Sequence, residues 1–175
     1  SRFISMLFSI NNYMISVELK AKPKITKWLR RNEIDVSVIE MCLNIILNKI
    51  RIWRKNCYKD IEIKKYKNNG SGYYFGFDEV HITENLDQNG WSKEKKLDTF
   101  TGHFLHEIRH WMQDNMLGVS ESKLNYTDEQ CDNDSSVYKY NRWEVDARRF
   151  ERRYKKEFID LYHTIEKLST KPDLS

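Results

Sequence analysis

The sequence predicts one α+β domain spanning residues 1–175, with its core between about residues 13 and 168. Several short stretches alternate apolar and polar residues, which is the period of half-buried strands. Two longer stretches repeat apolar residues every three or four positions, which is the period of helices. A chain of 175 residues can bury one sizeable core and is short for two domains. We therefore expect a small, mostly antiparallel sheet packed against a central helix and a long C-terminal helix.

The first expected element is a strand near residues 13–20, where every second residue is apolar. Pro23 should end this strand. A long helix is expected over about Glu33–Tyr58, because apolar residues recur there at steps of three or four. Cys42 and Cys57 lie on its apolar stripe, so we expect both to behave as small core hydrophobes.

A hairpin is expected next. Ile61 and Ile63 begin a second alternating segment, the Asn68–Gly72 cluster has the composition of a turn, and residues 73–77 form the returning strand. Val80–Ile82 adds a further short strand. These segments complete the predicted sheet.

The helix expected over residues 100–114 has two different faces. The apolar face holds Thr101, Phe104, Leu105, Ile108, Trp111 and Met112. The polar face holds His103, His106, Glu107, His110, Gln113 and Asp114. Residues 106–110 read H-E-x-x-H, and residues four apart lie one above the other on a helix, so both imidazoles can bind one zinc ion while the glutamate holds a water. The alternative is an amphipathic helix whose solvated face carries histidines.

A zinc site needs a third protein ligand. A third histidine six residues after His110, as in metzincins, is absent because Met116 occupies that position. A carboxylate on a later element is therefore expected, and Glu144 is the favoured candidate over Asp146. Both lie in the first turn of a predicted helix, where acidic side chains are also favoured by the helix dipole alone.

This last helix is expected to run to about residue 168 and to be capped by Asn141. Its apolar positions recur at steps of three and four: Trp143, Ala147, Phe150, Tyr154, Phe158, Leu161, Ile165 and Leu168. Glu144 and Asp146 lie at opposite margins of this stripe, so periodicity alone does not choose between them.

Together, H-E-x-x-H and a later E-x-x-A-x-x-F segment, formed by Glu144, Ala147 and Phe150, resemble the ImmA/IrrE-type metallopeptidases over about residues 79–155. The resemblance implies a zincin-like fold with a gluzincin-like site. In such a fold the strand before the zinc-binding helix pairs with an extended substrate, so Glu79–Thr83 is the candidate substrate-binding edge, with a plain sheet strand as the alternative. Arg148 stands where thermolysin-like enzymes have an aspartate.

The expected function is zinc-dependent hydrolysis of a peptide bond in a protein or peptide substrate. Zn²⁺ would be the cofactor, bound by His106, His110 and Glu144, and Glu107 would be the catalytic base that activates the zinc-bound water. Candidates for stabilising the oxyanion are Tyr138, Tyr140, His81 and His103. His103 or Asp114 can alternatively orient a zinc ligand.

Two other functions fit the same motif. One is a catalytically idle zincin-like module of a phage or mobile element that binds a partner. The other is a DNA-associated protease of the SprT kind, which also carries H-E-x-x-H. The basic run between Arg148 and Lys156 is expected to be a solvated helix face paired with Glu151 and Glu157, with nucleic-acid binding as the alternative.

The rest of the chain gives weaker expectations. The polar connection Asn115–Ser136 is long, so we expect it to border or cover the cleft. Phe3–Ile10 is apolar but too short to span a membrane, and no signal-peptide pattern is found. Three cysteines do not form a disulfide framework, and Cys131 is expected to be a free thiol. A cytoplasmic protein without a membrane partner is therefore expected.

Overall fold

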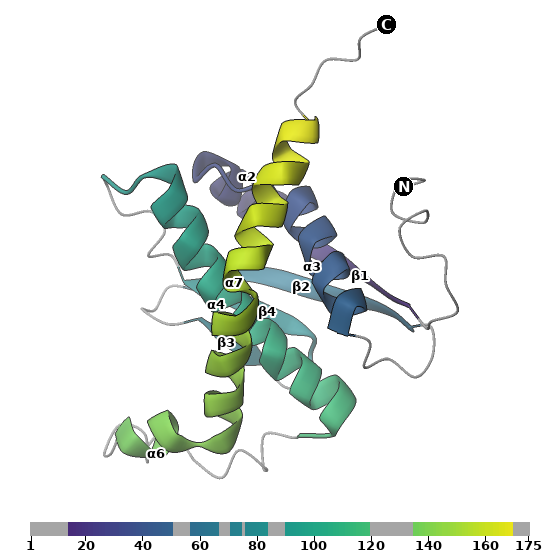
Figure 1. Ribbon diagram of the computed structural model, residues 1–175, viewed down its shortest axis with the longest axis vertical. Coiled ribbons are helices and arrows are strands. Elements are labelled where there is room, and N and C mark those ends of the chain that lie inside the picture. The colour runs from purple at the N-terminus through teal and green to yellow at the C-terminus, as the bar shows by residue number, and fades with distance from the viewer. Residues whose placement is uncertain are drawn as a thin grey trace, which may run out of the picture.

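A computed structural model describes residues 14–50, 57–66, 71–74, 76–83, 90–119 and 135–169 of the chain. The elements are β1 (Ile15–Ala21), α2 (Pro23–Arg31), α3 (Val36–Ile50), β2 (Cys57–Tyr66), β3 (Gly72–Tyr74), β4 (Glu79–Thr83), α4 (Lys93–Leu117), α6 (Ser135–Tyr140) and α7 (Arg142–Ser169). Helices α3 and α4 pack against the sheet, and α7 packs across both of them (Figure 1). The α+β class and the long C-terminal helix are confirmed.

The four strands form a mixed sheet in the order β1-β2-β4-β3. β1 pairs with β2 and β2 pairs with β4 in parallel, whereas β3 and β4 are antiparallel. The prediction of a mostly antiparallel sheet is therefore wrong. The predicted hairpin is also wrong, because β4 lies between β2 and β3, and the turn composition of Asn68–Gly72 indicates a chain reversal without specifying a partner strand.

The hairpin that does form joins β3 to β4. Its turn contains Gly76 and Asp78, whose φ angles of 79° and 50° are in the left-handed region that tight turns require. Because Tyr73 pairs with Val80, β4 has neighbours on both sides there. Glu79–Thr83 is thus an inner strand, so its prediction as the substrate-binding edge is wrong, and β3 lies at that end of the described sheet.

The predicted periodicities identify the core. The alternating residues of the three longest strands face the helices and are almost completely buried: Ile15, Val17, Leu19, Ile61, Ile63, Val80 and Ile82. All six residues of the predicted apolar face of α4 are fully buried. Phe104 of α4 meets Phe158 of α7 edge to face, with ring centroids 6.1 Å apart. Burial of such aromatic pairs fixes α7 on α4.

In the first half of the chain, the structure contains a helix that was not predicted and shortens the one that was. Pro23 does end β1, but it does so as the first residue of α2, a position where the missing N–H costs nothing. Helix α3 ends at Ile50, so the predicted helix Glu33–Tyr58 is too long. Cys57 opens β2 and is half-buried, while Cys42 is fully buried in α3. Apolar residues two apart beyond Cys57 fit a strand better than a helix.

Among the described strands, none pairs with the outer edge of β1, which is covered by side chains of α3. The Asn48 carboxamide accepts from the Ile15 N–H at 3.0 Å and donates to the Ile15 carbonyl at 2.8 Å. Asn44 does the same for Val17, at 2.8 and 2.9 Å. Each asparagine thereby supplies the two hydrogen bonds that a neighbouring strand residue would supply.

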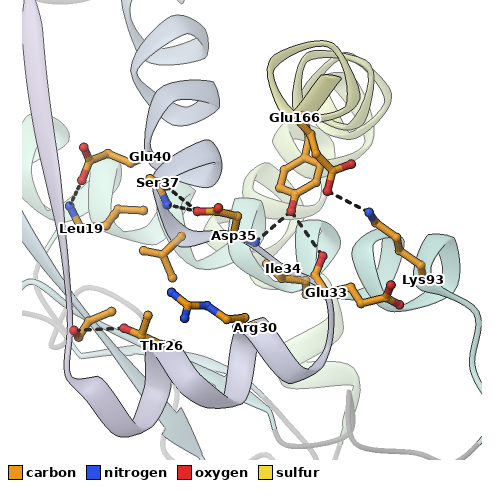
Figure 2. A pocket seen from close by; sticks show the side chains of 13 residues that line it. Leu19, Thr26, Arg30, Glu33, Ile34, Asp35, Ser37, Glu40, Lys93 and Glu166 are labelled. Carbon is orange, nitrogen blue, oxygen red and sulfur yellow. Dashed lines mark hydrogen bonds and ion pairs between the residues drawn. The ribbon is translucent and has the colours of Figure 1, made fainter. Parts of the chain in front are cut away.

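Glu40 continues this series one turn earlier on α3, and its carboxylate accepts from the Leu19 N–H at 2.8 Å (Figure 2). Four helix residues rise about 6 Å and two strand residues about 6.6 Å, so successive turns of α3 match alternate residues of β1. We call Glu40, Asn44 and Asn48 the edge ladder.

Several predictions concern residues outside the described ranges. They include residue 13 of the first predicted strand, Phe3–Ile10, Cys131 and most of the connection Asn115–Ser136. The described ends of the Asn115–Ser136 connection belong to helices, because α4 continues to Leu117 and α6 begins at Ser135. Within the described ranges, no helix is both long enough and apolar enough to span a membrane.

Candidate metal centre

His106 and His110 lie in the middle of α4, on consecutive turns. The helix is capped at its start by Ser92, whose hydroxyl accepts from the Lys95 N–H at 3.1 Å, and it ends at Gly118 in the left-handed conformation. The Nε2 atoms of the two imidazoles are 3.2 Å apart. A continuous helix with both ends capped holds this pair in a fixed relative position.

Glu144 reaches both imidazoles from the first turn of α7. Asn141 caps this helix by accepting from the Trp143 N–H at 2.9 Å, as predicted. One Glu144 oxygen lies 3.1 Å from Nε2 of His106, and the other lies 3.1 Å from Nε2 of His110. Glu144 is only 2% exposed.

The three side chains fit a metal ion. Ligand atoms bound tetrahedrally at about 2.0–2.1 Å lie about 3.3 Å from one another, which is close to the spacings found between these donor atoms. Imidazole nitrogens and carboxylate oxygens are both common metal ligands in proteins. His106, His110 and Glu144 can therefore hold a metal ion.

Asp146, the competing candidate, lies elsewhere. Its carboxylate accepts from Nε of Arg109 at 2.8 Å and from Nε2 of Gln113 at 2.9 Å. Two residues along a helix turn the side chain by about 200°, so Glu144 and Asp146 cannot both face the same imidazoles. Burial alone would raise the pKa of Asp146, but the bonds from Arg109 and Gln113 outweigh it and lower that pKa.

Electrostatics keep Glu144 ionised. Burial would raise the pKa of its carboxyl group, but hydrogen bonds from His106 and His110 outweigh burial and hold that pKa well below its usual range. The pKa of His110 is raised, since the Glu144 carboxylate opposes the lowering effect of burial. The centre therefore presents one negative charge to two imidazoles.

Glu107, the predicted base, is buried beside the centre. Burial raises the pKa of its carboxyl group to about 6, while the charges of His106 and His110 act in the opposite direction. The backbone N–H of Tyr73 in β3 donates to the Glu107 carboxylate. Edge strand β3 thus adjoins the centre.

Asp114 fixes β3 and its turn to α4. Its carboxylate accepts from the Tyr73 hydroxyl at 2.8 Å and from the Gly76 N–H at 2.8 Å. The Trp111 indole donates to Asp78 in the same turn at 2.7 Å. Asp114 therefore positions the strand, whereas the sequence predicted that it orients a zinc ligand.

An open cleft of about 470 Å³ borders His106 and Glu107. His103 and Tyr138 line it, so these two of the four predicted oxyanion candidates are near the centre. Tyr140 is instead 71% exposed at the end of α6. His81 lies on β4 with its Nε2 3.2 Å from Glu79.

The acidic residues of α7 do not pair as predicted. Glu157 forms an ion pair with Lys49 of α3 at 2.7 Å. Glu151 turns towards the cleft, with one oxygen 3.9 Å from Nδ1 of His106. Within the basic run, Lys155 pairs with Asp98 of α4 at 2.9 Å.

A slightly larger cavity, about 500 Å³, lies away from the centre and is bordered by β1, α2, α3 and α7 (Figure 2). None of the predicted site residues lines it. Several of its polar groups already have partners: Lys93 pairs with Glu166 at 2.8 Å, and Glu40 belongs to the edge ladder. The position of the metal centre thus follows from its donor atoms and not from cavity size.

Gln113 is the residue that sequence reasoning missed. It is fully buried, and its Oε1 lies 2.8 Å from Nδ1 of His110. The only signal in the sequence was its position three residues after His110 on the same helical face.

No protein-family model, no curated protein and no solved structure matches this chain. The geometry and donor chemistry of the centre therefore carry the functional conclusion.

Proposed function

We propose that the protein is a zinc-dependent metallopeptidase that hydrolyses peptide bonds of a protein or peptide substrate, with a site like that of the ImmA/IrrE-type enzymes. One observation supports this most strongly: Glu144 bridges His106 and His110 at 3.1 Å each, while Glu107 follows His106 in the wall of the same cleft. Two imidazoles and one carboxylate are donors that suit zinc.

When bound, zinc would polarise the scissile carbonyl and lower the pKa of a water in its open coordination position. Glu107 would accept the proton from that water and deliver it to the leaving amine. The Tyr73 N–H holds the Glu107 carboxylate in place for this transfer. Tyr138 and His103, which line the cleft, are the remaining candidates for a hydrogen bond to the oxyanion.

Strand β3 is suited to hold an extended substrate. It lies at the end of the described sheet, pairs with β4 there, and contacts α4 beside Glu107. Backbone pairing with an edge strand binds a peptide largely without regard to its sequence. The side chains that line the cleft would then select the residues next to the cleaved bond.

The proposal is tested by the metal content and turnover of Glu107→Gln beside the wild type. Both proteins should hold about one zinc per chain, because the substitution leaves all three ligands in place. A mixed-sequence peptide library should yield new N-termini with the wild type and none with the variant, as read by mass spectrometry. Equal cleavage by the variant would exclude Glu107 as the base. Zinc binding without cleavage by the wild type would favour the idle binding module.

The DNA-associated alternative has one observation in its favour. Arg149, Arg152, Arg153 and Lys156 are exposed on α7, while Glu157 pairs with α3 instead of with them. A salt-sensitive mobility shift of a DNA duplex at physiological ionic strength would support it.

A further inference from the structure

Gln113 makes three hydrogen bonds that together involve both helices of the metal centre. Its Oε1 lies 2.8 Å from Nδ1 of His110. Its Nε2 donates to the Trp143 carbonyl at 3.1 Å and to Asp146 at 2.9 Å. The carbonyl and the carboxylate can only accept, so the nitrogen of the amide must face them and the oxygen must face His110.

This orientation determines the tautomer of His110. An amide oxygen can only accept, so Nδ1 of His110 must carry a hydrogen. The other ring nitrogen, Nε2, lies 3.1 Å from Glu144 and 3.2 Å from His106; it is then the nitrogen that donates to Glu144 and that would offer its lone pair to a metal ion after losing its hydrogen. Gln113 thus selects the form of His110 that can bind a metal through Nε2.

The same amide also ties α7 to α4 at the position of the third ligand. The Trp143 carbonyl that it contacts belongs to the residue before Glu144. Asp146 is held in turn by Arg109 of α4, at 2.8 Å. One buried side chain therefore contacts both His110 and the residue before Glu144.

We propose that Gln113 is a positioning residue of the metal centre: it fixes the tautomer and ring orientation of His110 and braces the turn of α7 that carries Glu144. This inference rests on the proposed function in so far as the centre binds zinc. Partners of this kind typically change metal affinity by about 10- to 100-fold when they are removed.

The test compares Gln113→Met and Gln113→Glu with the wild type, using zinc in competition with a chromogenic chelator. Gln113→Met keeps the size and removes all three bonds, so zinc affinity should fall by about 10- to 100-fold. Gln113→Glu keeps an acceptor for Nδ1–H of His110 and should recover part of the loss. The visible absorption of the cobalt-loaded protein should change in Gln113→Met, because the His110 ligand is no longer held.

Thr101→Val is the matched control, since it also replaces a fully buried polar side chain of α4. It should leave zinc affinity and the cobalt spectrum unchanged. A Gln113→Met variant that binds zinc within about twofold of the wild type, with an unchanged cobalt spectrum, would overturn the inference while leaving the proposed function intact.

Two further outcomes remain decisive. If circular dichroism shows that Gln113→Met does not fold, Asp146→Ala replaces it, because this change keeps Gln113 and removes one of its partners on α7, together with the ion pair to Arg109. Zinc affinity should then fall several-fold, and an unchanged affinity would overturn the inference. A wild-type protein that binds no zinc would overturn the proposed function and the inference together.

Discussion

The backbone N–H of Tyr73 donates to the carboxylate of Glu107, so edge strand β3 and helix α4 meet at the predicted base. The hydroxyl of the same tyrosine donates to Asp114, one turn beyond His110. A single residue of β3 is thus attached to α4 at two points that flank the metal centre. Displacement of β3 would move the hydrogen-bond donor of Glu107 with it.

Tyr73→Phe should lower the free energy of unfolding by about 1–2 kcal/mol, because it removes a part-buried hydrogen bond to a charged group. Urea denaturation measures this change. Tyr58→Phe is the matched control, since Tyr58 also donates to a carboxylate, that of Glu18, but is 60% exposed. If Tyr58→Phe lowers the free energy of unfolding as much as Tyr73→Phe does, burial does not determine how much such a hydrogen bond contributes.

The stability of the wild type should also fall more steeply at high pH than that of Tyr73→Phe. Burial and the bond to Asp114 raise the pKa of Tyr73 above its usual value. The folded-state pKa of Tyr73 thus lies above the unfolded value of about 10. The stabilisation that its neutral hydroxyl contributes is therefore fully present below about pH 10 and is lost as the pH rises above it. Urea unfolding at pH 8 and at a pH above about 10 tests the sign. If the free energy of unfolding falls equally with pH in the wild type and in Tyr73→Phe, Tyr73 is not the group responsible.

Glu144→Ala should abolish tight zinc binding, whereas Asp146→Ala should weaken it only several-fold. Glu144 contacts both imidazoles, whereas Asp146 accepts hydrogen bonds from Arg109 and Gln113. Chelator competition ranks the two variants. The reverse ranking would make Asp146 the third ligand.

Removal of zinc should lower the melting temperature. A ligand at 100 times its dissociation constant stabilises the folded state by about 2.7 kcal/mol, and this stabilisation disappears when the ligand is removed. Thermal unfolding with excess zinc and with a chelator measures the difference. Glu144→Ala should show almost no difference between the two conditions, and an equal shift in that variant would point to zinc binding elsewhere.

Replacing two members of the edge ladder, in Asn44→Leu/Asn48→Leu, should promote self-association. The change leaves the outer N–H and carbonyl groups of Ile15 and Val17 without the side chains that satisfy them. Light scattering coupled to gel filtration should detect dimers or larger species. Asn44→Asp keeps the acceptor for the Val17 N–H and should self-associate less than the double variant. If it self-associates as readily, loss of the acceptor is not the cause of the self-association.

The two long helices that carry the site were predictable because their apolar residues repeat over many turns. Every residue placed on the apolar face of α4 is buried, and Asn141 caps α7. The order of the strands was not predictable. A Gly- and Asn-rich turn such as Asn68–Gly72 indicates that the chain reverses, but the pairing of β4 between β2 and β3 depends on long-range contacts that a turn does not encode.

The candidate site, too, was predictable only in part. H-E-x-x-H places His106 and His110 through helical geometry alone. Glu144 faces the two imidazoles and Asp146 does not, because of the rotation of α7 about its own axis relative to α4. The periodicity of the sequence does not determine this rotation, since the two residues lie at opposite margins of the apolar stripe. Gln113 escaped notice because a buried amide on a polar face has no sequence signature, and its role arises only from partners on the other helix.

The edge ladder limits where a further strand can pair with the described sheet. Side chains of α3 already hydrogen-bond to the outer N–H and carbonyl groups of Ile15 and Val17. Another polypeptide strand therefore cannot pair with β1 at these residues. The strand at the opposite end of the described sheet, β3, lies beside Glu107. If the protein is the proposed peptidase, an extended substrate would be excluded from one end of this sheet and received at the end that carries the base.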